Sequence, residues 1–172
     1  MSSTTEITLR HASIDDLELL ECWDTHQHVI DSDPDDDWDW SNELKRFPEW
    51  REQHIAELNG RPIGFVQIID PAKEESHYWG DVPNNLRAID IWIGEKGDLG
   101  KGYGTIMMQL AIDRCFEDAS VTAIIIDPLE SNSKAIRFYE RIGFQFVERR
   151  VLGSSNCSVY QLSPNQWQTK EL

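Results

Sequence analysis

Apolar and polar residues alternate along this chain with two periods, one typical of strands and one typical of helices. A two-residue period places apolar side chains on one face of a strand, and a period of about 3.6 residues places them on one face of a helix. We therefore predict strands at residues 7–10, 50–58, 62–69, 86–93, 121–126, 144–151 and 158–162. By the same reasoning we predict helices at residues 14–29, 40–46, 105–116 and 132–141.

Residues with special backbone or capping preferences support several of these boundaries. Ser13 is a favourable N-cap, because its hydroxyl can accept a backbone N–H of the first helical turn, and Asp16 stands near the third helical position. Asn59-Gly60 separates two predicted strands and favours a hairpin turn with positive φ. Residues 70–85 are polar and contain two prolines, which predicts a long loop.

The order of the elements and the length of the chain indicate the fold class. The strand, helix and strand predicted within residues 88–126 imply two parallel strands joined by a right-handed crossover. We expect a mixed sheet with helices on both faces, in a single α/β domain at residues 1–172. Apolar residues make up 40% of the chain and seven residues are tryptophan, a composition that excludes general disorder.

The chain is strongly acidic. Thirty-one acidic residues against sixteen basic ones give a net charge of −15, which repels nucleic acid and anionic lipid. We expect neither as a partner, whereas small cationic amines are favoured; a charge that serves solubility alone is the alternative. No apolar run reaches the roughly 18 residues of a membrane span, so we expect a cytoplasmic protein. Cys22, Cys115 and Cys157 are odd in number and lack CxxC spacing, which argues against a disulfide framework.

A glycine-rich turn is the most informative feature of the chain. It lies between a predicted strand and a predicted helix, and it consists of Leu99, Gly100, Lys101, Gly102, Tyr103, Gly104 and Thr105. Backbone N–H groups without side-chain cover, together with the positive end of a helix dipole, favour phosphate oxygens. Its spacing matches neither a Walker P-loop nor a dinucleotide fingerprint. A turn with no ligand is the alternative on this segment alone.

A second motif follows in the predicted helix at residues 132–141. Its characteristic residues are Asn132, Ala135, Tyr139, Gly143 and Phe144. The two motifs in this order resemble the Gcn5-related N-acetyltransferase (GNAT) superfamily. The resemblance implies a mostly antiparallel sheet whose two parallel central strands splay apart around acetyl-CoA. It also implies that the glycine turn binds the pyrophosphate, although Leu99 replaces the usual Gln or Arg.

The resemblance also implies which residues handle the coenzyme and its protons. Asn132, Ala135 and Tyr139 belong to the coenzyme site, and Tyr139 is the expected general acid for the departing thiolate. Backbone N–H groups of Ile91, Trp92 and Ile93 are expected to support the oxyanion. From the residues themselves, two carboxylates are candidates for the catalytic base. Asp90 lies within an apolar strand, where an acid requires a partner or a function, and Asp127 ends the next strand, where ligands commonly gather. Tyr139 as a packing residue and Asp127 as a turn residue are the structural alternatives.

A closer similarity, from roughly Leu9 to Tyr160, is to the aminoglycoside 6′-N-acetyltransferases. It is carried by Asn59–Gln67, Ala88–Asp90, Leu99–Thr105, Ile126–Pro128 and Ser131–Tyr139. In that family the residue matching Asp90 deprotonates the amine, the one matching Asp127 holds the polyamine sugar, and the one matching Gln67 lines the pocket. Residues 153–156 lack the acid that the family carries before its last strand.

Residues 31–39 have the least ordinary composition, with six aspartates and Trp38 next to a second tryptophan, Trp40. The family's Trp-Trp pair is absent here, and Trp38 and Trp40 are candidates to replace it as an acidic, aromatic border of the acceptor site. A solvated loop with locally packed tryptophans is the alternative. His26 and His28 next to these aspartates suggest a metal, but no closed ligand set completes such a site, so we expect none.

We therefore predict an acetyl-CoA-dependent N-acetyltransferase that acts on a small polycationic amine, an aminoglycoside-like molecule above all. It would transfer the acetyl group directly, with a carboxylate base and a tyrosine acid, as a monomer or homodimer. Acetylation of polyamines or of protein N-termini is an alternative within the same chemistry. A non-catalytic acyl-CoA-binding module is a further alternative, although it leaves Asp90, Asp127 and Tyr139 without a purpose.

Overall fold

The computed structural model describes residues 4–32, 34 and 36–170, with the backbone alone at residues 169 and 170. The strands are β1 (Ile7–His11), β2 (Arg51–Leu58), β3 (Arg61–Ile69), β4 (Leu86–Ile93), β5 (Ala123–Ile126), β6 (Gln145–Leu152) and β7 (Ser155–Leu162). The α-helices are α1 (Leu17–Trp23), α2 (Gln27–Ser32), α3 (Trp40–Glu43), α4 (Tyr103–Phe116), α5 (Ser133–Ile142) and α6 (Pro164–Lys170), and the 3₁₀ helices are η1 (Ile14–Asp16) and η2 (Lys96–Asp98).

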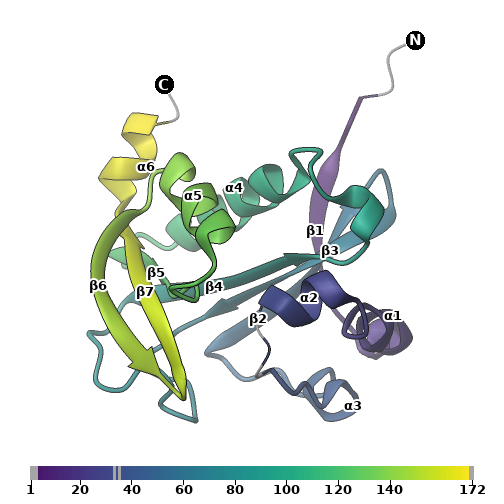
Figure 1. The fold of residues 1–172 in the computed structure, drawn as a ribbon, viewed down its shortest axis with the longest axis horizontal. Helices are drawn as coiled ribbons and strands as arrows, with labels where there is room; N and C mark the ends of the chain where they lie inside the picture. Colours follow the sequence, from purple (N-terminus) through teal and green to yellow (C-terminus); the bar gives the residue numbers. More distant parts are fainter. Residues whose placement is uncertain (1–3, 33, 35, 171–172) are drawn as a thin grey trace. The chain divides into compact units, whose positions relative to one another are not determined.

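The strands form one seven-stranded sheet in the order β1-β2-β3-β4-β5-β7-β6 (Figure 1). It is mostly antiparallel, and β4 and β5 are its parallel pair, so the predicted α/β fold class and the parallel crossover are confirmed. The chain divides into two compact units. One holds residues up to 67 and residues 90–111, and the other holds residues 68–89 and those from 112 onward.

In the first unit, β1 and β2 pair antiparallel, with Ile7 opposite Leu58. Asn59 (φ 49°) and Gly60 (φ 87°) both take positive φ between β2 and β3, as predicted for a two-residue hairpin turn. Helices α1, α2 and α3 gather on one side of these strands (Figure 1). Helix α4 lies on the opposite face, because a Cβ atom at Gly64 would stand only 2.6 Å from the Met107 side chain.

The helix predicted at residues 14–29 is wrong in its continuity. Its start is confirmed, since Ser13 and Asp16 form a reciprocal capping box at η1. The chain then breaks between α1 and α2, where the Thr25 hydroxyl donates to the Cys22 carbonyl at 2.6 Å and replaces regular helical bonding. His26 donates to the carbonyl of Gly94 at 2.8 Å, which fixes the direction in which α2 begins.

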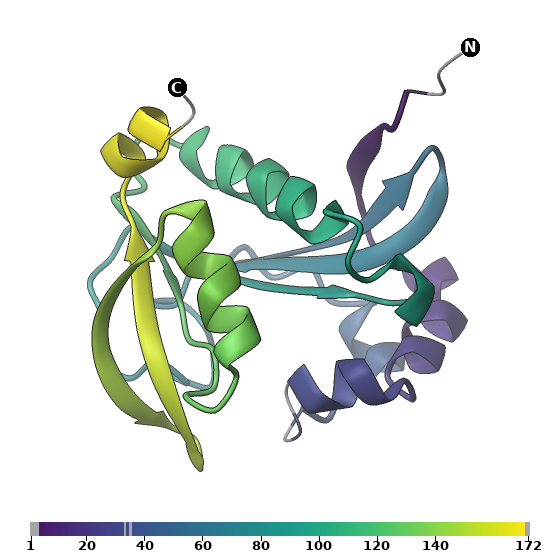
Figure 2. The same ribbon diagram turned by 45° about the horizontal axis from the view of Figure 1, so that its top comes forward.

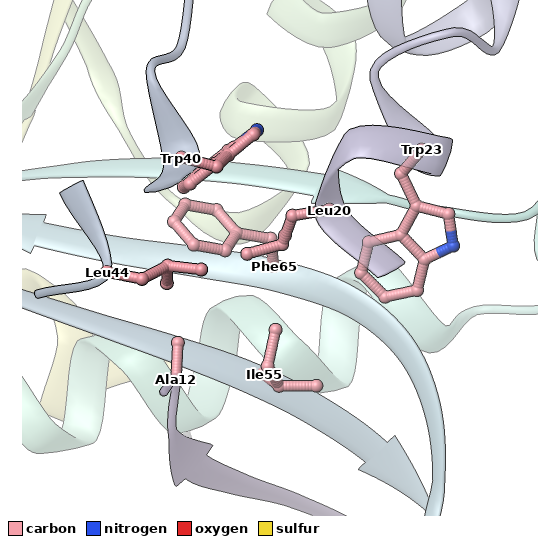
Figure 3. Close-up of a cluster of buried hydrophobic side chains, with 7 residues drawn as sticks. All are labelled: Ala12, Leu20, Trp23, Trp40, Leu44, Ile55 and Phe65. Atoms are coloured by element: carbon pink, nitrogen blue, oxygen red, sulfur yellow. The ribbon is translucent and has the colours of Figure 1, made fainter. Parts of the chain in front are cut away.

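An aromatic core holds the first unit together. Figure 3 shows its buried members, which are Ala12, Leu20, Trp23, Trp40, Leu44, Ile55 and Phe65. Trp23 packs directly on the backbone of Gly94, where a Cβ atom would lie 2.0 Å from the indole. Only glycine fits at that position, so the end of β4 is held tightly against α1.

In the second unit, β7 lies between β5 and β6 and pairs antiparallel with both. The parallel register of β4 with β5 joins Leu86 to Ala123 and Ala88 to Ile125, and β4 continues to Ile93 beyond it. Figure 2 shows α5 alongside β7, and the Tyr160 hydroxyl donates to Glu140 of α5 at 2.7 Å. Helix α6 was not predicted; its buried Trp167 donates to Asp113 at 2.8 Å and attaches it to the end of α4.

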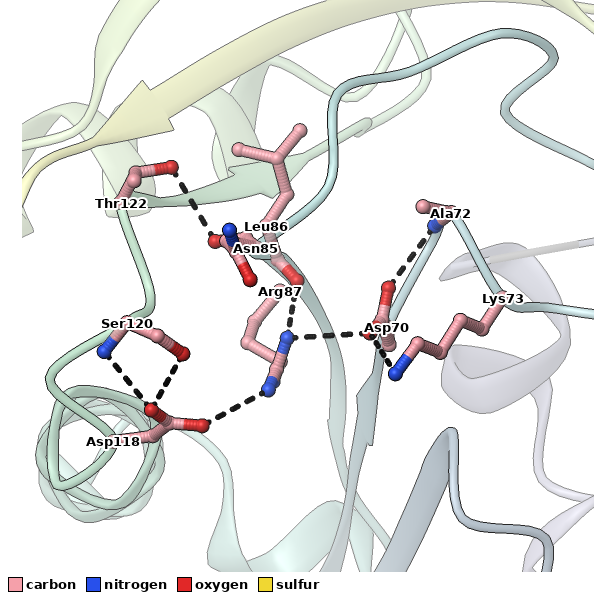
Figure 4. A network of polar contacts seen from close by, with 9 residues as sticks. All are labelled: Asp70, Ala72, Lys73, Asn85, Leu86, Arg87, Asp118, Ser120 and Thr122. Atoms are coloured by element: carbon pink, nitrogen blue, oxygen red, sulfur yellow. Dashed lines mark hydrogen bonds and ion pairs between the residues drawn. The ribbon is translucent and has the colours of Figure 1, made fainter.

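The second unit has its own apolar cluster and a charged network. Its buried members are Trp79, Leu86, Ala88, Ala123, Ile125, Leu152 and Cys157. At the start of β4, Arg87 reaches both Asp70 and Asp118 at 3.5 Å (Figure 4). This ties the loop after β3 to the turn before β5. Cys22, Cys115 and Cys157 form no disulfide among the described residues, and Cys115 and Cys157 are buried. Within the described residues, no helix is long and apolar enough to cross a membrane.

Candidate active site

A relay of side chains crosses three strands of the first unit. The Gln53 amide of β2 donates to Gln67 Oε1 at 2.9 Å, and the Gln67 amide donates in turn to Asp90 Oδ2 at 2.9 Å. Gln53 and Gln67 are buried, at 9% and 3% exposed, and Asp90 is half-buried. Because the Gln67 oxygen accepts from Gln53, its N–H group is directed at Asp90. The relay therefore holds one carboxylate oxygen in a fixed position.

Strand periodicity explains why aromatic rings lie beside this relay. Phe65 stands two residues before Gln67, and Trp92 stands two residues after Asp90, so the four side chains share one face of the sheet. Phe65 and Trp92 stack, with ring centroids 4.4 Å apart. The buried indole N–H of Trp92 has no hydrogen-bond acceptor among the described residues. Such a group is unusual in a folded protein.

A pocket of about 250 Å³ opens against Trp92 within the same unit. Its lining consists of Asp24, Val29, Ile30, Ser32, Pro34, Asp36, Asp37, Trp38 and Trp92. These residues include three aspartates and no lysine or arginine, so the pocket favours a cation. Two further aspartates of the predicted acidic border, Asp33 and Asp35, lie outside the described residues.

The two tryptophans of the acidic segment have different environments. Trp38 is half-buried and lines the pocket, while Trp40 is 2% exposed in the aromatic core. Their rings stack at 4.5 Å, and the Trp40 indole donates to Asp24 at 2.6 Å. Burial raises the pKa of Asp24, against the effect of this hydrogen bond. Trp40 thus stabilises Trp38 by stacking and Asp24 by its hydrogen bond, and it offers almost no surface of its own to a ligand.

The two histidines considered as metal ligands bond to the backbone instead. His26 Nδ1 donates to the Gly94 carbonyl at 2.8 Å, and His28 Nε2 donates to the Ile93 carbonyl at 2.9 Å. Since a carbonyl oxygen only accepts, these contacts define the protonated ring nitrogens. They fix the end of β4, the strand that carries Asp90. Residues 4–32, 34 and 36–170 contain no group of three or more side chains suited to a metal ion.

The glycine turn has the backbone geometry that a phosphate cradle requires. Gly100 and Gly102 take φ of 74° and 82°, and a Cβ atom added to either would meet nothing within 4 Å. Open space therefore lies over this backbone, while Tyr103, Gly104 and Thr105 form the first turn of α4. The N–H groups of a first turn have no partner within their helix, which suits an anion. These residues fit the diphosphate of a coenzyme.

An ion pair anchors the base of the glycine turn. Asp98 ends η2, is 5% exposed, and accepts two hydrogen bonds from Arg61 at 2.9 and 3.0 Å. The Arg61 guanidinium lowers the pKa of Asp98. Leu99 follows in an extended conformation, and Lys101 is exposed. The turn is thereby connected to the β2–β3 hairpin.

In the second unit, the residues of the second motif lie within helix α5 and at its two ends. Asn132 is its N-cap, and its side chain accepts the backbone N–H of Ala135 at 3.1 Å. Gly143 ends the helix with φ 125°, and the next residue, Phe144, is buried. Tyr139 is half-buried, with its ring edge-on to Phe144 at 5.8 Å. Asn132 and Gly143 are thus accounted for by the start and the end of the helix, whether or not a ligand binds.

Asp127 follows β5 directly and is half-buried. The Tyr78 hydroxyl, from the loop between β3 and β4, donates to Asp127 Oδ2 at 2.6 Å. The structure therefore brings Gln67, Asp90 and Trp92 together in one unit, and pairs Asp127 with Tyr78 in the other. Sequence reasoning missed Gln53 and Tyr78. Gln53 had a detectable signal, because it is polar at an inward-facing position two residues before Ile55.

Comparison with known proteins decides the family. The model of the acetyltransferase (GNAT) domain matches residues 13–152. The chain belongs to the GNAT acetyltransferase family. The aminoglycoside N(6′)-acetyltransferase type 1 of Klebsiella pneumoniae is 31% identical over 181 residues, covering 96% of this chain and 86% of the relative. A kanamycin resistance protein of Rhizobium radiobacter is 37% identical over 94 residues, which cover 54% of this acetyltransferase and 86% of that protein.

Solved structures agree with this assignment. The aminoglycoside acetyltransferase AAC(6′)-Ib in complex with coenzyme A has a TM-score of 0.86 and 26% identity. The match covers 97% of this acetyltransferase and 100% of that chain. The same enzyme with coenzyme A and kanamycin gives the same TM-score and identity. The GNAT fold and the family that the two sequence motifs indicated are confirmed.

Proposed function

We propose that this acetyltransferase transfers the acetyl group of acetyl-CoA to the 6′-amine of an aminoglycoside. The observation that carries the proposal is the Gln53–Gln67–Asp90 relay, which fixes a carboxylate on the strand face that also carries Trp92, a lining residue of the acidic pocket. A base for amine acetylation must be a carboxylate or histidine held in place, and a polycationic acceptor requires negative surroundings. The relatives support the acceptor class, because those named above are aminoglycoside acetyltransferases and a kanamycin resistance protein.

Acetyl-CoA fits the glycine turn. Backbone N–H groups of Gly100, Gly102 and the first turn of α4 would hold its diphosphate, in the open space that the glycines leave. Leu99, Lys101, Tyr103, Gly104 and Thr105 complete this segment, and Asn132, Ala135 and Tyr139 would border the coenzyme from α5. When bound, acetyl-CoA supplies an activated acetyl thioester.

Each proton has a proposed holder. Asp90 accepts a proton from the acceptor's ammonium group, directly or through a water, and leaves a neutral amine. Gln67 keeps the Asp90 carboxylate in place through Oδ2. When the amine nitrogen bonds to the acetyl carbon, the thioester C–S bond would break and Tyr139 would give its hydroxyl proton to the departing sulfur. The surplus proton on the new amide nitrogen would return to the Tyr139 oxygen. Backbone N–H groups of Ile91, Trp92 and Ile93 would stabilise the developing oxyanion, since His26 and His28 fix that end of the strand.

Acceptor recognition is assigned to carboxylates and one aromatic face. Asp127 would hold a second ammonium or hydroxyl group of the sugar. Trp38 would contribute an aromatic face near Asp36 and Asp37, which suits a cation. Trp40 would act only by supporting Trp38.

Release of free thiol from acetyl-CoA tests the proposal. Two aminoglycosides that differ only in carrying an amine or a hydroxyl at C6′ make a matched pair of acceptors. We expect thiol release with the 6′-amine and at most a hundredth of that rate with the 6′-hydroxyl. Equal rates would contradict 6′ transfer.

Spermidine and a peptide with a free N-terminus are included, because polyamine and N-terminal acetylation share this chemistry. Activity with either one alone would replace the aminoglycoside as acceptor. Binding of acetyl-CoA with no release in the presence of any acceptor would favour a non-catalytic acyl-CoA-binding module.

A further inference from the structure

The loop at residues 70–85 of the second unit is well ordered around one glutamate. Glu74 accepts the backbone N–H of Ser76 at 2.7 Å, the Ser76 hydroxyl at 2.8 Å and the backbone N–H of Tyr78 at 3.1 Å. Although burial opposes ionisation, these hydrogen bonds lower the pKa of Glu74. His77 takes a positive φ of 55° within this bend. The backbone at Tyr78 is therefore held by a carboxylate that is charged at neutral pH.

The residue after Tyr78 fixes the loop from its other side. Trp79 is 4% exposed in the apolar cluster of this unit, and its carbonyl accepts a hydrogen bond from Arg150 at 3.2 Å. The Tyr78 ring lies edge-on to the Trp79 indole, with centroids 5.4 Å apart. Tyr78 itself is 42% exposed. An aromatic side chain thus stands at the surface on an anchored backbone.

This ordered loop directs the Tyr78 hydroxyl to Asp127 Oδ2, at 2.6 Å. The backbone after Asp127 is also fixed, because the carbonyl of Pro128 accepts the N–H of Ser158 at 3.0 Å. With the backbone held at Pro128, the hydrogen bond from the Tyr78 hydroxyl favours one orientation of the Asp127 carboxylate. A carboxylate that is ordered before the ligand arrives binds a cation more tightly, since its rotamer entropy is already lost.

We propose that Tyr78 is a positioning residue that holds the Asp127 carboxylate ready for a cationic group of the acceptor. This inference rests on the proposed function, in which Asp127 binds the acceptor. Tyr78 acts through Asp127 and takes no part in proton transfer. The loop between β3 and β4 thereby contributes to acceptor affinity.

The test is a double-mutant cycle of Tyr78→Phe and Asp127→Asn in the full chain. Titration calorimetry with kanamycin as the probe measures the dissociation constant without requiring turnover. Tyr78→Phe keeps the ring and its contact with Trp79 but removes the donor. We expect it to weaken kanamycin binding about tenfold, and to have less than a twofold effect when Asp127→Asn is already present.

Steady-state kinetics and a matched variant separate positioning from a loss of structure. Tyr78→Phe should raise KM for kanamycin while kcat and KM for acetyl-CoA stay within twofold of wild type. Tyr160→Phe is the control, because Tyr160 also donates to a carboxylate, that of Glu140, in the same unit. It should leave the dissociation constant of kanamycin unchanged.

The outcomes distinguish this inference from the proposed function. Unchanged kanamycin binding in Tyr78→Phe, or an equal loss in the Asp127→Asn background, overturns the positioning role alone. A wild-type protein that binds kanamycin but acetylates no acceptor would overturn the transfer reaction. The positioning role would still hold if Tyr78→Phe then bound kanamycin more weakly than wild type. No kanamycin binding by the wild-type protein overturns both.

Discussion

The Gln67 amide donates to Asp90 Oδ2 at 2.9 Å, and both side chains lie on the face of the sheet that bears the aromatic cluster. Gln67 is 3% exposed, and its own oxygen accepts from Gln53, so it has one orientation in which every bond is satisfied. A buried amide that is fixed in this way stabilises the charged form of Asp90. The proposed base therefore depends on a neutral donor.

Gln67→Glu should convert this donor into a competing carboxylate. Two carboxylates that share one site resist simultaneous ionisation, so Asp90 would hold its proton to higher pH. We expect kcat/KM at pH 7 to fall about tenfold or more, and to recover as the pH rises by one to two units. The pH profile of kcat/KM for the acceptor measures this change.

The matched control is Gln168→Glu, which makes the same charge change on an exposed residue of α6. Its pH profile should coincide with that of wild type. A Gln67→Glu profile that falls in rate without shifting along the pH axis would mean that Gln67 only packs, and would remove Asp90 from the role of base.

Gly102→Ala should weaken acetyl-CoA binding. The position has room for a methyl group, but its φ of 82° disfavours any residue with a Cβ atom, and the methyl would occupy the space above the turn. We expect KM for acetyl-CoA to rise about tenfold or more with KM for the acceptor unchanged, as measured by thiol release. Gly97→Ala is the control, because Gly97 has equal space, belongs to η2 and lacks a positive φ. A similar rise in both variants would argue against a cradle at Gly102.

Much of the fold was predictable because its signals are local. Asn59-Gly60 favours a hairpin turn with positive φ, and the strand predicted at Leu86–Ile93 has the same bounds in the structure. Helix α6 was missed, because its docking depends on Trp167 and its partner Asp113, which lie far apart in the sequence. The direction of α2 after the break was missed for the same reason, since the His26 partner is the distant carbonyl of Gly94.

The site was predictable where the residue types of a motif determine the backbone conformation. Gly102 needs positive φ and Asn132 caps a helix, and both requirements are visible in the sequence. Side-chain partners such as Gln53 for Gln67, or Tyr78 for Asp127, come from other strands and loops. Pairing of that kind is set by strand register and loop path, which a single sequence does not display.

Tyr139→Phe should separate coenzyme binding from proton donation. The ring keeps its edge-on contacts with Phe138 and Phe144, at 5.3 and 5.8 Å, so the melting temperature should change little. If the hydroxyl supplies the proton to the thiolate, kcat falls about 100-fold or more. The dissociation constant of acetyl-CoA, measured by calorimetry, should stay within twofold of wild type. A wild-type kcat in this variant would exclude Tyr139 as the acid.

Asp24→Asn should raise the stability of the protein and weaken acceptor binding. Burial raises the pKa of Asp24 above its usual 3.8, so the folded protein binds this proton more tightly than the unfolded chain does. The cost of the buried charge is absent well below pH 3.8, develops as the pH rises to the folded pKa, and is complete above the folded pKa. Asparagine keeps an oxygen for the Trp40 indole and carries no charge.

The melting temperature of Asp24→Asn at pH 7 should therefore exceed that of wild type, by about 2 °C for a chain of this size. The difference should shrink as the pH falls through the raised pKa of Asp24 toward 3.8, because wild-type Asp24 is then increasingly protonated as well. Because the substitution also removes one of three carboxylates from the pocket beside Trp92, KM for a cationic acceptor should rise at the same time. Glu18→Gln, an equal charge change on the exposed face of α1, should alter neither quantity. A lower melting temperature at pH 7 would show that the Asp24 charge stabilises its surroundings, and an unchanged KM would place the acceptor's cation elsewhere.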